Sequence, residues 1–222
     1  MVLDLSIPEQ LETEYLIRNY SAKTIQAGIK RGFDLVAAAI LLLLSSPLLC
    51  IVAILVRLQD GGPAIYKRRV VGPKGEFPAY KFRTMRVDAD ERLATDPDLK
   101  HIFERNFKLE NDPRVTKLGS FLRKYSLDEL PQLLNVVKGQ MSLVGPRMLT
   151  EAELGKYGTV RELILRVKPG ITGYWQVNGR QKVSYEERTR MDIYYIRNWS
   201  LMLDLYILCK TPFTVIKGEG AY

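Results

Sequence analysis

A long apolar segment dominates the hydrophobicity pattern of this chain. From Phe33 to Val56 the only ionisable side chains are Asp34 and Cys50, and most of the other residues are leucine, isoleucine, valine or alanine. A helix of about 20 apolar residues is long enough to span a bilayer. The leucine density over this length argues against a core helix of a soluble domain, and the position and flanks of the segment are not those of a secretory signal peptide.

Pro47 lies in the middle of the apolar segment and directly follows Ser45 and Ser46. Proline lacks a backbone N–H and clashes with the carbonyl four residues earlier, so we expect a kink, with the serine hydroxyls satisfying the freed backbone groups. Basic residues flank both ends: Arg18, Lys23, Lys30 and Arg31 upstream, and Arg57, Lys67, Arg68, Arg69 and Lys74 downstream. Because positive flanks favour the cytoplasm, the pattern predicts a re-entrant helix–break–helix anchor over residues 30–58, broken at Ser46 and Pro47.

The chain after this segment begins with two β-like runs. Residues 64–71 and 76–85 are rich in β-branched and aromatic residues, and a Gly-Pro-Lys-Gly turn joins them. This pattern predicts a basic β-hairpin whose second strand is interrupted at Pro78. Residues 88–110 and 117–124 have the composition of helices.

A second apolar stretch runs from Trp199 to Ile216 and contains Asp204, Lys210 and Pro212. It fits an interfacial helix that lies on a membrane with Trp199 and Tyr206 at the level of the headgroups. An ordinary amphipathic core helix fits nearly as well.

The charge of the chain limits its partners and its chemistry. There are 33 Lys and Arg against 25 Asp and Glu, a net charge of +8, which suggests nucleic acid, anionic lipid or a phosphorylated small molecule as partner. A single histidine, His101, and two cysteines in apolar runs exclude a two-histidine metal site and a multi-cysteine cluster. Catalysis would therefore depend on carboxylates, Lys, Arg, Tyr or hydroxyl groups.

The segment from Ser126 to Gly139 holds the most informative polar residues. Leucine and valine recur at helical spacing after Pro131, Gly139 suits a helix end, and Ser126 with Glu129 fits a capping box. This pattern places Asp128 and Glu129 at the positive end of a helix. By itself such a motif is usually only a cap.

Cations on both sides of this acidic pair change the interpretation. Arg123 and Lys124 precede it, and a short strand leads through a Gly-Pro turn to Arg147. Carboxylates with Mg²⁺ and arginine forks are the groups that phosphoryl transfer needs, and a carboxylate can also attack phosphorus. The surrounding cations and the helix dipole predict that Asp128 is ionised at neutral pH.

Five motifs occur in a fixed order along the chain: KRGFDL at 30–35, Ser46-Pro47, KFRTM at 81–85, SLDELPQLLNVVKGQMSLVGPR at 126–147 and KPGITGYWQVNGR at 168–180. Together they resemble the bacterial polyprenol-phosphate sugar-1-phosphate transferases, the monotopic phosphoglycosyl transferases. The resemblance extends from Lys30 to the C-terminus.

The resemblance implies a reaction and its machinery. The substrates would be a UDP-sugar and undecaprenyl phosphate, and the products undecaprenyl-diphosphate-sugar and UMP. Asp128 matches the nucleophile that forms a covalent phosphosugar intermediate, Glu129 matches its partner carboxylate, and Mg²⁺ would bind beside Asp128. The candidate substrate-binding residues are Lys81, Arg83, Arg123, Arg147, Gln176 and Arg180. Solvated strand cations or lipid-headgroup ligands remain the alternative for Lys81 and Arg83, and a loop cap for Gln176.

The expected fold class is α+β and mostly helical, with a small basic β-hairpin and helices on a re-entrant anchor. We expect an N-terminal extension at 1–29, the re-entrant helix at 30–58, and a cytosolic-face catalytic domain with an interfacial C-terminal helix at 59–222. The resemblance implies the cytoplasmic face of the bacterial inner membrane, with anionic lipids as further partners.

The acidic pair disfavours a membrane-tethered nucleic-acid-binding protein, so no nucleic acid is expected. A scaffold for other glycan enzymes remains an alternative. Galactose or glucose is the expected sugar, with an N-acetylated sugar as the alternative, and a homo-oligomer stays open.

Overall fold

The computed structural model describes residues 24–96, 101, 112–179 and 183–217, so most of the predicted N-terminal extension lies outside the described residues. The elements, in chain order, are α2 (Thr24–Asp60), β1 (Ile65–Gly72), β2 (Gly75–Phe82), α3 (Ala89–Thr95), α5 (Lys117–Lys124), the 3-10 helix η1 (Leu127–Gln132), α6 (Leu133–Val137), β3 (Ser142–Val144), α7 (Glu151–Leu154), the 3-10 helix η2 (Gly155–Val160), α8 (Arg161–Leu165), β4 (Gly170–Thr172), α9 (Tyr174–Asn178), α10 (Tyr185–Arg197) and α11 (Leu201–Lys217). This content confirms the α+β, mostly helical fold class.

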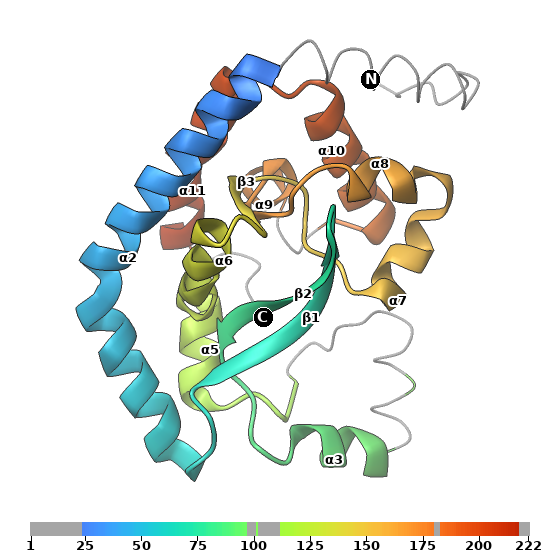
Figure 1. The fold of residues 1–222 in the computed structure, drawn as a ribbon. Coiled ribbons are helices and arrows are strands. Elements are labelled where there is room, and N and C mark those ends of the chain that lie inside the picture. Colours follow the sequence, from blue (N-terminus) through green and yellow to red (C-terminus); the bar gives the residue numbers. More distant parts are fainter. Residues whose placement is uncertain (1–23, 97–100, 102–111, 180–182, 218–222) are drawn as a thin grey trace.

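The apolar segment forms a single 37-residue helix, α2, with a mean hydropathy of 2.9 over its most apolar window, of which only 11% is buried. By length and composition it could cross a membrane. Figure 1 shows α2 along one side of the molecule, changing direction near its middle so that both ends approach the other elements. The helix continues through Pro47 rather than dividing into two helices, and its bend agrees with the kink that the sequence predicts.

Hydroxyl groups explain why the helix can continue through its proline. Pro47 cannot donate to the carbonyl of Leu43, four residues earlier. The Ser46 Oγ donates to that same carbonyl at 2.8 Å, and the Ser45 Oγ donates to the carbonyl of Leu41 at 2.6 Å. The freed acceptor is thus satisfied within the helix, as the sequence predicts.

The N-terminal half of α2 is fastened to the other elements by polar contacts. Arg31 donates to the carbonyls of Val136 and Val137, at 2.7 and 3.1 Å, and so binds the negative end of α6. Asp34 is only 3% exposed, and its carboxylate accepts from the Ser142 hydroxyl at 2.7 Å and from the Leu143 N–H at 3.3 Å. Helix α2 is therefore hydrogen-bonded directly to β3.

Helix α11 joins the same polar cluster through Asp204. The Lys30 ammonium lies 2.7 Å from one Asp204 oxygen, which also accepts from the Trp199 indole N–H at 3.2 Å. The Tyr195 hydroxyl donates to the other oxygen at 2.7 Å. Trp199 is 8% exposed, so its predicted place at the headgroups is wrong, because its indole N–H is used in this buried cluster.

The C-terminal end of α2 is held by Arg83, just after β2. Its guanidinium donates to both Asp60 oxygens, at 2.5 and 2.6 Å. It also donates to the carbonyls of Val56, Pro63 and Met85, at 3.3, 2.8 and 3.3 Å. Both ends of the apolar helix are therefore attached to the same folded body.

The β-hairpin forms as predicted, with β1 and β2 antiparallel and Arg69 opposite Pro78. The expected interruption at Pro78 is wrong, because β2 runs through it. The buried side chain of Asn135 donates to the Pro78 carbonyl at 2.7 Å and accepts from the Tyr80 N–H at 3.0 Å. Asn135 takes the place of a neighbouring strand along this edge of β2. The N–H that Pro78 lacks therefore breaks no hydrogen bond between strands there.

A parallel pair, β3 and β4, lies beside α2 and α11. A Cβ on Gly170 would lie 2.1 Å from the Gly145 nitrogen, and a Cβ on Gly145 would lie 2.5 Å from the Lys168 carbonyl oxygen. Only glycine permits this backbone approach. The strand at Gly170–Thr172 is not among the elements that the sequence predicts.

Helix α11 combines both alternatives that its sequence leaves open. Ile207 and Asp204 are buried on one side, as in a core helix. The exposed side chains are also largely apolar: Met202, Leu205, Tyr206, Phe213 and Ile216. Helices α2 and α11 therefore both present apolar surface, which fits a membrane anchor made of two elements.

Replacing Asp34 by Ala tests the attachment of α2. The change leaves the Leu143 N–H without its buried acceptor, at about 1–3 kcal/mol, and leaves the Ser142 hydroxyl with the Val144 carbonyl as its acceptor. We expect the thermal midpoint of the detergent-solubilised protein, followed by tryptophan fluorescence, to fall by about 5–10 °C. Asp90→Ala, at an exposed position on α3, is the matched control and should shift it by less than about 2 °C. Equal midpoints for the two variants would contradict this role of Asp34.

Candidate active site

Asp128 and Glu129 lie in the first turn of η1, which leads directly into α6. The predicted capping box is wrong, because Ser126 has a left-handed backbone (φ 54°) and its side chain does not cap the turn. Pro131 lacks a backbone donor and sits inside the 3-10 turn. Gly139 has φ 77° and follows the helix end, as predicted.

The Asp128 carboxylate is buried, with 7% of the residue exposed. Burial raises the pKa of Asp128 to about 6, and the neighbouring charge of Glu129 adds to the rise. The positive charges of Lys81 and Arg123 lower the pKa but do not cancel the effect of burial. The ionised form still predominates at neutral pH, as expected. The pKa nevertheless rises, because desolvation outweighs the nearby cations.

Glu129 forms an ion pair with Lys81, whose ammonium lies 2.5 Å from one carboxylate oxygen. Burial alone would raise the pKa of Glu129, but Lys81, with Arg147 and Arg68, holds it below its usual value. The two adjacent carboxylates therefore differ, since Glu129 is paired with Lys81 and Asp128 is buried with no hydrogen-bonded cation among the described residues. Such divergence is typical of carboxylates with separate roles at one site.

Arg123 approaches the acidic pair from the end of α5. Its Nε donates to the Thr84 hydroxyl at 2.9 Å, and its charge favours ionised Asp128. Thr116 caps α5, and a Cβ on Gly119 would lie 2.0 Å from the Thr84 carbonyl oxygen, so α5 packs directly on the chain after β2. Close packing thus places Arg123 beside the dyad.

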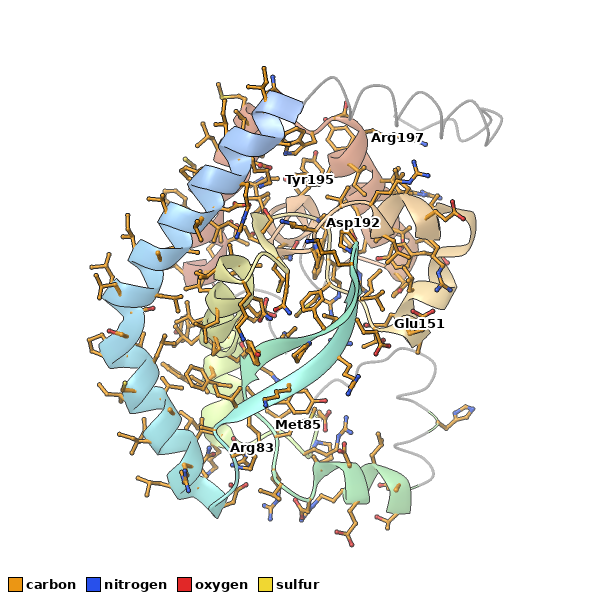
Figure 2. All side chains as sticks on the ribbon, in the orientation of Figure 1. Arg83, Met85, Glu151, Asp192, Tyr195 and Arg197 are labelled. Atoms are coloured by element: carbon orange, nitrogen blue, oxygen red, sulfur yellow. The ribbon has the colours of Figure 1, made fainter. Side chains whose placement is uncertain are left out.

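Arg83 is not brought to this site. All five of its N–H donors are used by Asp60 and three backbone carbonyls, and Figure 2 shows it near the C-terminal end of α2. Its contacts support a structural role. Arg180, another predicted substrate-binding residue, lies outside the described residues.

Arg147 and Gln176 are held by contacts with α9, α10 and β4. The backbone N–H of Arg147 donates to Asp192 at 3.2 Å, and its guanidinium centre lies 5.2 Å from the centroid of the Trp175 ring. Gln176 donates to the Ile171 carbonyl at 3.4 Å, whereas its buried side-chain oxygen has no partner in the described part of the chain. The bond from Gln176 to the Ile171 carbonyl fits a loop cap, whereas the unpartnered side-chain oxygen of Gln176 does not.

Two buried polar residues near the site were not identified as site residues from the sequence. Gln132 is fully buried, and neither amide atom has a partner among the described residues. In a 3-10 turn it lies on the same side as Glu129, three residues earlier. Asp192 is 1% exposed, and its burial raises its pKa to about 7; Figure 2 shows it well inside the fold. The only sequence signal is a polar residue within an apolar pattern.

The donor set limits how a metal could bind. Within the described ranges, no group of three or more His, Cys, Asp or Glu side chains is suited to a metal ion. Mg²⁺ needs fewer protein ligands, because one or two carboxylates and substrate phosphates commonly hold it. The poorly compensated Asp128 carboxylate and its neighbour Glu129 fit such a substrate-dependent site.

The family comparison covers nearly the whole chain. A model of the family described as bacterial sugar transferase matches residues 25–218. An undecaprenyl-phosphate galactose phosphotransferase of Salmonella typhimurium is 47% identical over 211 residues, covering 93% of this chain but 44% of that protein. A UDP-glucose:undecaprenyl-phosphate glucose-1-phosphate transferase of Escherichia coli is 40% identical over 203 residues, 87% of this chain and 41% of that protein.

A shorter relative matches almost end to end. The exopolysaccharide production protein ExoY of Rhizobium meliloti is 47% identical over 198 residues, covering 87% of this chain and 88% of the relative. The chain thus spans less than half the length of some relatives and most of another. These matches confirm the resemblance drawn from the five motifs, and the chain belongs to the bacterial sugar transferase family.

Proposed function

We propose that this protein transfers galactose-1-phosphate or glucose-1-phosphate from a UDP-sugar to undecaprenyl phosphate, giving undecaprenyl-diphosphate-sugar and UMP. The observation that carries the proposal is the pair of adjacent carboxylates, with Asp128 buried and Glu129 in an ion pair with Lys81. The charge of Arg123 acts on Asp128. The printed names of the relatives, which mention galactose, glucose and undecaprenyl phosphate, support the choice of substrates. This would be the first membrane step of surface polysaccharide synthesis.

The reaction runs in two steps at one phosphorus atom. An Asp128 oxygen attacks the sugar-linked phosphorus of the donor, the bond to the bridging oxygen breaks, and UMP leaves with that electron pair. An oxygen of undecaprenyl phosphate then attacks the same phosphorus and releases Asp128 as a carboxylate. Glu129, kept ionised by Lys81, accepts a proton from the acceptor phosphate if it arrives protonated.

Cations of the protein neutralise the substrates at this site. Lys81 and Arg123 lie beside the carboxylates that the phosphate must approach, so they reduce the repulsion between anions. Asp128, with Glu129 beside it, would hold Mg²⁺, which when bound neutralises phosphate charge.

The membrane arrangement follows from the two attachments of α2. Because Asp34 and Asp60 bind the same folded body, a straight crossing would require that body on both sides of the bilayer. We propose that α2 bends back within one leaflet, on the cytoplasmic face of the bacterial inner membrane, with α11 at the interface. Anionic lipids would contact the basic residues beyond α2.

The first test concerns the nucleophile. Asp128→Asn keeps the shape of the side chain and removes the attacking anion, so we expect turnover to fall by several powers of ten and the covalent intermediate to disappear. Intact-protein mass, after incubation with UDP-galactose or UDP-glucose without acceptor, should show a hexose-phosphate adduct on wild type only. Glu129→Gln should be severely impaired yet still form the adduct, and exposed Asp90→Asn is the control. An adduct that persists in Asp128→Asn would refute the covalent step.

Transfer of radiolabel into lipid by purified protein tests the overall reaction. A panel of UDP-sugars should give the highest rate with galactose or glucose. Fastest transfer from a UDP-N-acetyl sugar would overturn the sugar assignment. The same assay tests the metal: excess chelator should abolish transfer, and Mg²⁺ should restore it. Undiminished turnover in chelator would remove the metal from the reaction.

Labelling in intact bacterial cells tests the topology. With Cys50 and Cys209 replaced, single cysteines near Lys23 and near Lys67 should both resist a membrane-impermeant maleimide and react after permeabilisation. Replacing Pro47 by Ala restores the missing backbone donor and should straighten α2, so that one of the two positions becomes accessible. Labelling of either position without that replacement would indicate a true span.

A further inference from the structure

A cluster of N–H donors surrounds the indole ring of Trp175 in α9. The guanidinium centres of Arg147 and Arg188 each lie 5.2 Å from the ring centroid. Arg188, in α10, also lies 4.8 Å from the ring centroid of Tyr185. Aromatic contacts on two sides therefore orient the Arg188 side chain, and one indole connects it with Arg147.

Three donors in this cluster are buried and unused. The Nε atoms of Arg147 and Arg188 and the Nε1 of Trp175 have no hydrogen-bond partner among the residues described, and Trp175 is only 5% exposed. All three can only donate. Buried donors without an acceptor are costly and rare in folded proteins. A ligand with acceptor oxygens would satisfy these three donors.

The carboxylates around the cluster are already engaged. Asp192 accepts from the Arg147 backbone N–H and from the Tyr157 hydroxyl, at 3.2 and 3.4 Å. Glu153 pairs with Arg68 at 2.7 Å and accepts from Thr150. Burial, and then the charge of Arg147, lower the pKa of Arg188. An anion between the two guanidinium groups would relieve their repulsion.

Arg147 links the cluster to the dyad, because it packs on Trp175 and its charge helps to hold the pKa of Glu129 below its usual value. We propose that Arg188 and Trp175, together with Arg147, form a second phosphate subsite, which holds the phosphate that leaves as part of UMP. This rests on the proposed function. Lys81 and Arg123 already face the carboxylates where the sugar-linked phosphorus must react, so the neighbouring cluster suits the other phosphate of the diphosphate. Guanidinium forks match phosphate oxygens in geometry and charge.

Binding of UMP and of uridine separates a phosphate contact from a nucleoside contact. The full chain in detergent, at constant Mg²⁺, is titrated calorimetrically with each compound. Arg188→Gln should weaken UMP binding by about 10- to 100-fold and change uridine binding by less than about twofold. Arg190→Gln, at an exposed position two residues along α10, is the matched control and should leave both affinities unchanged. Equal weakening of UMP and uridine, or none, would overturn the proposal.

Steady-state kinetics then assign the phosphate to one substrate. Arg188→Gln should raise KM for the UDP-sugar about tenfold or more and leave KM for undecaprenyl phosphate within about twofold. A rise confined to undecaprenyl phosphate would assign the cluster to the acceptor and overturn the proposal. UMP binding is measured without turnover, so it tests the phosphate subsite separately from the transfer reaction. Unchanged UMP binding with continued formation of lipid-linked sugar would refute the subsite alone. Weakened UMP binding without any formation of lipid-linked sugar would refute the proposed function alone.

A conservative variant guards against loss of the fold. If Arg188→Gln lowers the thermal midpoint strongly, Arg188→Lys replaces it, because lysine keeps the charge and removes the planar fork. We then expect UMP binding to weaken relative to Arg190→Lys, with uridine unaffected. Trp175→Phe, which keeps an aromatic ring and removes the indole donor, should also weaken UMP binding alone. Unchanged UMP affinity in both Arg188→Lys and Trp175→Phe would contradict the subsite.

Discussion

The attachment of both ends of one apolar helix to a single folded body is the constraint on which the structure depends. Near its start, the buried Asp34 carboxylate binds β3 and Lys30 reaches Asp204 of α11. At its end, Asp60 holds Arg83 beyond β2. Pro47 and the hydroxyl of Ser46 allow the bend that makes both attachments compatible. The catalytic elements are therefore assembled directly on the helix that we place in the membrane, where a lipid-linked acceptor would be found.

The same assembly creates the electrostatics of the site. The short turn η1 packs against β2, so Asp128 is desolvated while Glu129 meets Lys81 from the strand. Burial raises the pKa of Asp128 and the ion pair lowers that of Glu129. Adjacent acids of similar chemistry thus acquire different properties from position alone. Cations continue beyond the dyad through Arg147 to Arg188, which suits a substrate carrying two linked phosphates.

Lys81 and Arg83 lie in the same sequence motif but have different roles in the fold. Both are cations in one motif, and both were expected to bind substrate. Lys81 contacts the dyad, whereas Arg83 uses three donors on Asp60 and Val56 at the end of α2 and its other two on the carbonyls of Pro63 and Met85. Trp199 is a similar case, since its apolar context suggested a membrane interface and a buried carboxylate instead accepts its N–H. Sequence spacing does not encode which partner a long polar side chain will reach.

The sequence by itself determined the apolar helix, the hairpin, the α+β class and the acidic dyad, because these follow from local periodicity, turn residues and motif order. Only the tertiary structure decided the 3-10 form of the dyad turn, the pairing of β3 with β4, the structural use of Arg83 and the donor cluster around Trp175. Each of these depends on contacts between segments far apart in the chain, such as β2 with Asn135 or Arg147 with Trp175. Desolvation likewise arises only after packing, which is why the direction of the Asp128 pKa shift could not be read from neighbouring charges.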